Sequence, residues 1–97
     1  MTRRRQKYNT TSTFNTSLSR SGKDIRRSYK ARLNLFLKNH QDPKLKDHQM
    51  SGKLKNYRCF NIKGEWITIY SYRGGKLFLE LITTHTDLNS IDKILTF

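Results

Sequence analysis

A group of polar side chains in the second half of the sequence could carry out acid–base chemistry. Its members are His48, Arg58, Asn61, Glu65 and His85. Histidine and glutamate side chains can take up and release protons in an enzyme, and an arginine can stabilise a developing negative charge. Each residue also has a plain structural interpretation, as a loop histidine, a turn carboxylate or a helix-capping residue. Composition alone does not decide between the two.

The common motifs of metal and nucleotide sites are missing from the sequence. It has no glycine-rich phosphate loop, no zinc-type spacing of cysteine and histidine, and no G-x-S-x-G motif. The three histidines, His40, His48 and His85, are too far apart for a local metal motif. We therefore expect a site that works without a metal or a cofactor.

The single cysteine, Cys59, cannot form a disulfide within the chain. This is typical of a protein of the reducing cytoplasm. Cys59 could in principle act as a nucleophile, but we prefer to interpret it as a small strand residue. No apolar run approaches the roughly 20 residues that a membrane span needs, and no secretory leader is apparent.

The charge of the sequence indicates a polyanionic partner. The 97 residues carry 20 Lys and Arg against 7 Asp and Glu, which gives a net charge of +13. Self-repulsion on this scale favours an acidic ligand, and nucleic acid is the first candidate because its binding releases counterions. An anionic membrane surface ranks second, since no predicted helix pairs a basic face with a tryptophan-rich one. A merely soluble basic surface ranks well below nucleic acid.

Charge and polar residues together would suit RNA cleavage. That reaction needs a base for the 2′-hydroxyl proton, an acid for the leaving 5′-oxygen, and cations for the phosphate. Histidine and glutamate can fill the first two roles. Lys46, Lys53 and Lys55 lie near His48 in the sequence and could fill the third.

Helices are predicted in the first half of the chain. An apolar stripe at helical spacing is interrupted at Gly22, and Ser21 with Asp24 resembles a capping box, so we expect a helix from about Lys23 to Asn39, before Pro43. Residues 8–13 are a candidate edge strand. Residues 1–7 would form a flexible basic arm, and residues 89–97 a C-terminal tail.

A sheet is predicted in the second half. Residues 57–62, 65–72 and 76–83 are rich in β-branched and aromatic side chains and are separated by tight turns. They predict an antiparallel β-meander with the helices on one face and the other face left for binding. The fold class would be α/β in the α+β sense, with residues 1–97 forming one domain.

The order of motifs between Lys46 and Leu88 resembles the RelE superfamily of bacterial toxins, and within it the YafQ-type ribosome-dependent mRNA endonucleases. The matching motifs are Lys46-Asp47-His48, Gly52, Tyr57-Arg58, Glu65-Trp66-Ile67-Thr68-Ile69-Tyr70 and Thr84-His85-Thr86-Asp87-Leu88. The resemblance implies a RelE-like fold of the microbial-ribonuclease type. It also implies a type II toxin that inhibits translation by cleaving mRNA in the ribosomal A site. The partners would be the ribosome, mRNA and an acidic cognate antitoxin.

The resemblance also implies roles for individual residues. His48 and His85 match the catalytic histidines of the family, Glu65 replaces an aspartate, and Trp66 matches a tryptophan of the active cleft. Asn61 belongs to the same candidate catalytic set. The candidate RNA-binding residues are Lys46, Lys53, Lys55, Arg58, Trp66 and Arg73.

The sequence departs from the family pattern at three positions. Asn61 stands in place of a histidine, Leu81 in place of a phosphate-binding arginine, and Asn89 in place of an aromatic residue. We expect these changes to weaken catalysis unless Arg58 or Arg73 takes over from the lost arginine. Two alternatives remain open. One is a non-catalytic inhibitor on the same scaffold, which binds the ribosome or acts as ParE toxins do on gyrase. The other is a general basic RNA-binding module.

Overall fold

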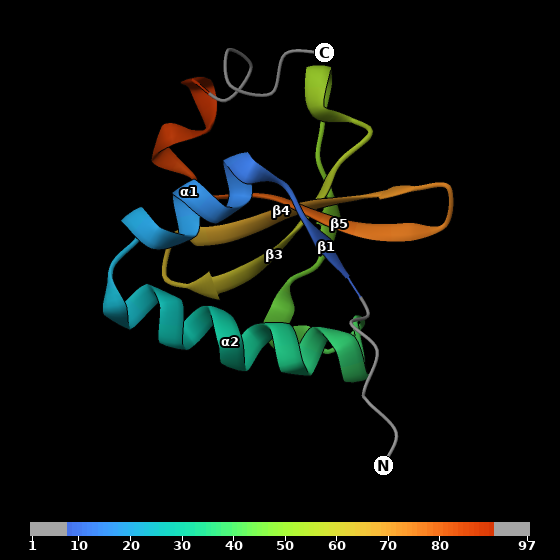
Figure 1. The fold of residues 1–97 in the computed structure, drawn as a ribbon. Helices are drawn as coiled ribbons and strands as arrows, with labels where there is room; N and C mark the ends of the chain where they lie inside the picture. The colour runs from blue at the N-terminus through green and yellow to red at the C-terminus, as the bar shows by residue number, and fades with distance from the viewer. Residues whose placement is uncertain (1–7, 91–97) are drawn as a thin grey trace.

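A computed structural model describes residues 8–90 of the chain (Figure 1). The predicted basic arm, residues 1–7, and the end of the predicted tail, residues 91–97, lie outside the described residues. The helices and strands are β1 (Asn9–Thr10), α1 (Ser12–Arg20), α2 (Lys23–Lys38), β2 (His48–Gln49), β3 (Arg58–Lys63), β4 (Trp66–Arg73) and β5 (Lys76–Thr84). Short 3₁₀ segments are η1 (Pro43–Leu45), η2 (Gly52–Leu54) and η3 (Thr86–Ser90).

The strands form one mixed sheet in the order β1-β5-β4-β3-β2. The meander β3-β4-β5 is antiparallel, as predicted, and the fold class is confirmed as α+β with two helices packed against a five-stranded sheet. The edge strand β1 pairs parallel with β5, with Asn9 beside Phe78. Beyond β1, the hydroxyl of Ser17 on α1 accepts a hydrogen bond from the backbone N–H of Ile82, so α1 continues to cover the edge of β5.

The two helices are separated by a sharp turn at Gly22. Gly22 has φ 95°, a left-handed conformation that glycine adopts without steric cost. The predicted start of α2 at Lys23 is confirmed, but the predicted capping box is wrong. The hydroxyl of Ser21 donates to the carbonyl of Leu18 and thereby closes α1 instead. The start of α1, by contrast, is capped by the side chain of Thr11, whose hydroxyl accepts from the N–H of Phe14 at 3.0 Å.

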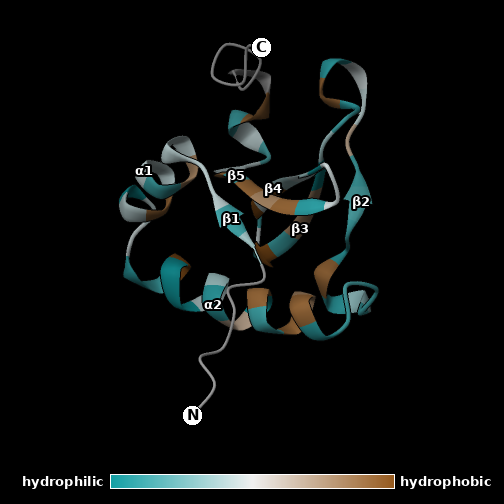
Figure 2. Cartoon of the chain, turned by 45° about the vertical axis from the view of Figure 1, so that its right-hand side comes forward, coloured by the Kyte–Doolittle hydropathy of each residue, from teal (hydrophilic) through white to brown (hydrophobic). Residues whose placement is uncertain are grey.

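The main core lies between the helices and one face of the sheet. Figure 1 shows α2 lying across this face, with α1 at its side. Figure 2 shows hydrophobic residues concentrated on the central strands, while α2 alternates between hydrophobic and hydrophilic residues. Phe36 of α2 stacks on Phe60 at 4.8 Å between ring centroids and meets the edge of Tyr70 at 4.9 Å. The buried members of this core include Phe14, Ile25, Tyr29, Leu33, Phe36, Leu45, Phe60, Ile62, Tyr70, Leu77, Leu79 and Ile82.

The opposite face of the sheet, here called the outer face, has a smaller apolar core of its own. Its buried members are Leu54, Tyr57, Cys59, Ile67, Ile69 and Leu81, with Met50 and Leu88 packed at the margin. The face predicted to be left for binding therefore carries apolar residues of its own. The segments that contain η2 and η3 fold over these residues and bury them. In the described part of the chain, no helix is both long and apolar enough to cross a membrane.

We expect Phe36→Ala to destabilise the protein by about 3–5 kcal/mol, because it removes a fully packed aromatic ring from the main core. Urea unfolding followed by circular dichroism measures this change. Tyr72→Ala is the matched control, since Tyr72 is 56% exposed and should lose far less stability. Equal losses in the two variants would contradict the assignment of Phe36 to the centre of the core.

Candidate active site

His48 and His85, far apart in the sequence, line the same pocket. Its volume is about 390 Å³, and Lys53 lines it as well. Three of the predicted site residues are therefore brought together between β2, η2, the end of β5 and η3. The full lining is His48, Gln49, Met50, Ser51, Lys53, Leu54, Cys59, His85 and Leu88. We call this the histidine pocket.

Strand pairing places His48 on the outer face. His48 lies opposite Cys59 in the β2–β3 pair, Cys59 lies opposite Ile69, and Ile69 lies opposite Leu81. Residues directly opposite one another across antiparallel strands project to the same face. The four side chains therefore form one row across the sheet, with the histidine at its exposed edge and three apolar or weakly polar residues behind it.

The contacts of the His48 ring indicate which nitrogen carries the proton. Nδ1 lies 2.8 Å from the carbonyl oxygen of Lys46, and a carbonyl can only accept a hydrogen bond. Nδ1 is therefore the donor, and in the neutral ring Nε2 keeps its lone pair. Nε2 lies 3.5 Å from Sγ of Cys59, at the wall of the pocket. The orientation suits a general base that works through Nε2.

The residue before His48 anchors it to the rest of the fold. The side chain of Asp47 is 6% exposed, and its Oδ1 accepts from the hydroxyl of Tyr70 at 2.7 Å and from Nε of Arg58 at 3.3 Å. Burial raises the pKa of the Tyr70 hydroxyl well above its usual range, and the hydrogen bond to Asp47 adds to the shift, so Tyr70 remains a neutral donor. The sequence analysis did not identify this anchor. The signal that the sequence offered was the carboxylate of Asp47, which lies between Lys46 and His48 in a strongly cationic chain.

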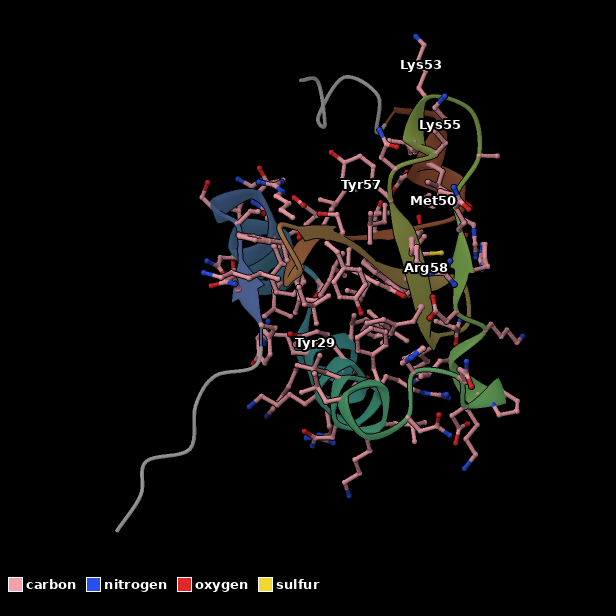
Figure 3. The ribbon with its side chains drawn as sticks, turned by 90° about the vertical axis from the view of Figure 1, so that its right-hand side faces the viewer. Tyr29, Met50, Lys53, Lys55, Tyr57 and Arg58 are labelled. Carbon is pink, nitrogen blue, oxygen red and sulfur yellow. The ribbon has the colours of Figure 1, made fainter. Side chains whose placement is uncertain are left out.

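This arrangement also places Arg58 away from the histidine pocket. Arg58 pairs with Asp47, and both residues line a separate hollow of about 300 Å³ with Lys46. Figure 3 shows Arg58 below Tyr57 and Met50, with Lys53 and Lys55 at the far end of the molecule from Tyr29 of α2. Lys55 is exposed and lies outside the lining of the histidine pocket.

Glu65 holds the backbone of His85 in place. The N–H of His85 donates to the carbonyl oxygen of Glu65 at 3.0 Å. The carboxylate of Glu65 accepts from the hydroxyl of Thr86 at 2.6 Å and from its N–H at 3.2 Å. These bonds from Thr86 lower the pKa of Glu65, and nearby His85 contributes further. Glu65 therefore fixes the segment that follows β5, and its carboxylate does not line the pocket.

Two other predicted residues point elsewhere. The amide of Asn61 donates to the carbonyl of Gly64 at 2.8 Å and so stabilises the β3–β4 turn. Trp66 packs against the main core and lines a different groove, between α1 and η3.

Leu81 and Arg73 show what the outer face offers in place of the missing arginine. Leu81 is 5% exposed and belongs to the outer core, and it lines the groove between α1 and η3 rather than the histidine pocket. Arg73 lies over the ring of Phe78 and donates from Nη2 to both carboxylate oxygens of Glu80, at 2.7 and 2.9 Å. Glu80 is 2% exposed. Arg73 therefore forms an ion pair with the buried Glu80 and does not lie in the row that contains Leu81.

A family model described as the bacterial toxin of type II toxin–antitoxin systems, YafQ, matches residues 6–90. A search of curated proteins found no match.

Solved structures share the fold. YafQ from E. coli strain BL21(DE3) has a TM-score of 0.71 and 22% identity, covering 87% of this chain and 98% of that one. A chain of the E. coli DinJ–YafQ complex has a TM-score of 0.68 and 24% identity, with coverage of 87% and 98%. A chain of the RelB–RelE antitoxin–toxin complex from Methanococcus jannaschii has a TM-score of 0.66 and 16% identity, with coverage of 84% and 95%.

We expect Cys59 to be a poor nucleophile despite its contact with His48. Burial and, to a smaller extent, the charge of Asp47 raise the pKa of its thiol to about 11, against the opposing effect of Arg58. At pH 8 the thiolate fraction should thus be about a hundredfold below that of an unperturbed thiol. Reaction with a chromogenic disulfide measures this, and it should become fast in urea. Fast labelling of the folded protein would contradict the buried thiol.

Proposed function

Because the chain belongs to the YafQ family of bacterial toxins from type II toxin–antitoxin systems, we propose that it is an mRNA endonuclease that acts on the translating ribosome. The reaction would be metal-independent cleavage of mRNA in the A site. The observation that carries the proposal is the meeting of His48, His85 and Lys53 in one pocket on the outer face.

The two histidines can divide the proton transfers between them. His48 would act as the base, with Nε2 taking the proton of a ribose 2′-hydroxyl. The 2′-oxygen then bonds to the adjacent phosphorus, and the bond from phosphorus to the 5′-oxygen breaks. His85, in its protonated form, would give its proton to that leaving oxygen. The products are a 2′,3′-cyclic phosphate and a 5′-hydroxyl.

Lys53 and Glu65 would support this chemistry in different ways. Lys53 lines the pocket from η2 and would stabilise the negative charge that grows on the phosphate. Glu65 would act as an orienting residue, because its carboxylate is already bonded to Thr86 and its lowered pKa makes it a weak base. Lys46, Lys55, Arg58 and Arg73 lie outside the pocket lining, and in this proposal they contact RNA only away from the cleaved bond.

The net charge of +13 supports the proposed partners. Such a charge favours binding to mRNA and to ribosomal RNA. It also favours an acidic antitoxin, and a chain of similar fold was solved in complex with DinJ. The proposed setting is the cytoplasm, where ribosomes and mRNA are found.

A non-catalytic inhibitor is the second candidate. The observations that favour it are the buried Leu81 in place of an arginine and the amide of Asn61, which is held in a turn. Such a protein would keep the binding surface and block the A site without cutting. A general RNA-binding module accounts less well for the family match over residues 6–90.

We expect His85→Gln to reduce A-site cleavage by at least about a hundredfold, because it removes a proton-transfer group. The measurement is mRNA cleavage on programmed ribosomes, with circular dichroism to confirm folding. His40→Gln is the matched control, since His40 lies outside the histidine pocket and its contact with Asp47, 3.9 Å from Nδ1 to Oδ2, is long beside the bonds that Asp47 makes to Tyr70 and Arg58. Cleavage by this variant should stay within about twofold.

The same assay separates the two candidates. Wild-type protein that binds ribosomes tightly but leaves the mRNA intact would refute the endonuclease and support the inhibitor. Equal cleavage by wild type and His85→Gln would refute the assigned role of His85.

A further inference from the structure

A second groove lies between α1, the end of β5 and η3. It is larger than the histidine pocket, at about 590 Å³, which is within the range of small-molecule sites. In Figure 1 the red segment η3 lies close to α1 at one end of the sheet. The lining is Ser12, Thr13, Thr16, Ser17, Arg20, Ser21, Trp66, Leu81, Ile82, Thr83 and Asp87. We call this the α1 groove.

The α1 groove and the histidine pocket share η3 as a common wall. His85 and Leu88 line the histidine pocket, whereas Asp87, between them in sequence, lines the α1 groove. An RNA strand whose phosphate is held between the two histidines would therefore have this groove just across η3. The groove is placed where an adjacent nucleotide can reach it.

The charged side chains of the groove are not paired with one another. Among the described residues, Arg20 makes no ion pair, and the carboxylate of Asp87 accepts no hydrogen bond. The hydroxyls of Ser12, Thr13 and Thr16 likewise have no protein partner in the described part of the chain. A cation, a carboxylate and several hydroxyl groups are thus available to a ligand.

The chemistry of these groups matches the parts of a nucleotide. A guanidinium binds phosphate, a carboxylate accepts hydrogen bonds from ribose hydroxyls, and an aromatic side chain offers a flat surface to a base. Arg20, Asp87 and the half-buried Trp66 supply one of each. A peptide ligand could form hydrogen bonds with the hydroxyls, but it would not in general need both the guanidinium of Arg20 and the carboxylate of Asp87.

We propose that the α1 groove binds one nucleotide of the RNA strand next to the cleaved bond, with Arg20 on its phosphate, Asp87 on its ribose and Trp66 against its base. This inference rests on the proposed function, because it extends the path of the same RNA. It assigns to Trp66 a place outside the histidine pocket, and it gives Arg20 of α1 a contact with the RNA backbone.

Trp66 provides a direct readout, since it is the only tryptophan of the chain. Adenosine 5′-monophosphate is a suitable probe because it contains no phosphodiester bond that could be cleaved. We expect it to quench the fluorescence of Trp66, excited at a wavelength the nucleotide does not absorb, in a saturable way. Ribose 5-phosphate, which lacks a base, should quench much less.

The variant Arg20→Gln should weaken binding by about tenfold, because a charge-assisted hydrogen bond to the phosphate is lost. Arg27→Gln is the matched control, as it removes the same charge from an exposed position on α2 that does not line the groove. Equal weakening by the two variants would mean non-specific attraction and would overturn the proposal. Quenching by an antitoxin peptide but not by the nucleotide would also overturn it.

The two proposals can fail separately. Adenosine 5′-monophosphate could quench Trp66 in a saturable, Arg20-dependent way while the protein leaves mRNA on ribosomes intact. That result would support the groove and refute the endonuclease. Cleavage without any response of Trp66 to the nucleotide would leave the endonuclease standing and refute the groove.

Discussion

The burial of one carboxylate, that of Asp47, ties the two faces of the sheet together. A carboxylate removed from water is costly unless hydrogen bonds and a cation compensate it, and here the hydroxyl of Tyr70 and the guanidinium of Arg58 do so. Tyr70 in turn packs against Phe36 in the main core. Because β2 is only two residues long, its own pairing with β3 is a weak restraint. The position of His48 therefore depends on a contact made by its neighbour on the helix side of the sheet.

The apolar floor of the histidine pocket is made by Met50, Leu54, Cys59 and Leu88. Cys59 lies opposite His48, and Ile69 and Leu81 continue the same row within the outer core, outside the pocket lining. An apolar floor strengthens electrostatic interactions at its rim, because less water screens them. It supplies no positive charge of its own, and the cation in the lining of the pocket is Lys53 on η2. In the proposed mechanism Lys53 therefore takes the phosphate-stabilising role, since the buried Leu81 cannot fill it.

The long elements could be predicted from the sequence because their side chains repeat with a clear period. The helix expected from Lys23 and the three strands of the meander lie within a residue or two of their observed bounds. The short strand β2 and the outer core were missed, since both depend on tertiary contacts. The face of the sheet to which each side chain points could not be predicted either. Arg58 and Cys59 are adjacent in β3 and so point to opposite faces, and only the register tells which of them meets His48.

The carboxylate of Glu65 has a structural role at the end of the sheet. It accepts hydrogen bonds from both the hydroxyl and the N–H of Thr86, at the start of η3. That segment separates the histidine pocket from the α1 groove, so the carboxylate holds the wall between the two cavities. A carboxylate committed to this contact is a poor proton acceptor, so in the proposed mechanism the two histidines carry out the proton transfers. The proposed path of the RNA then depends on η3, which would lie between the scissile phosphate and the next nucleotide.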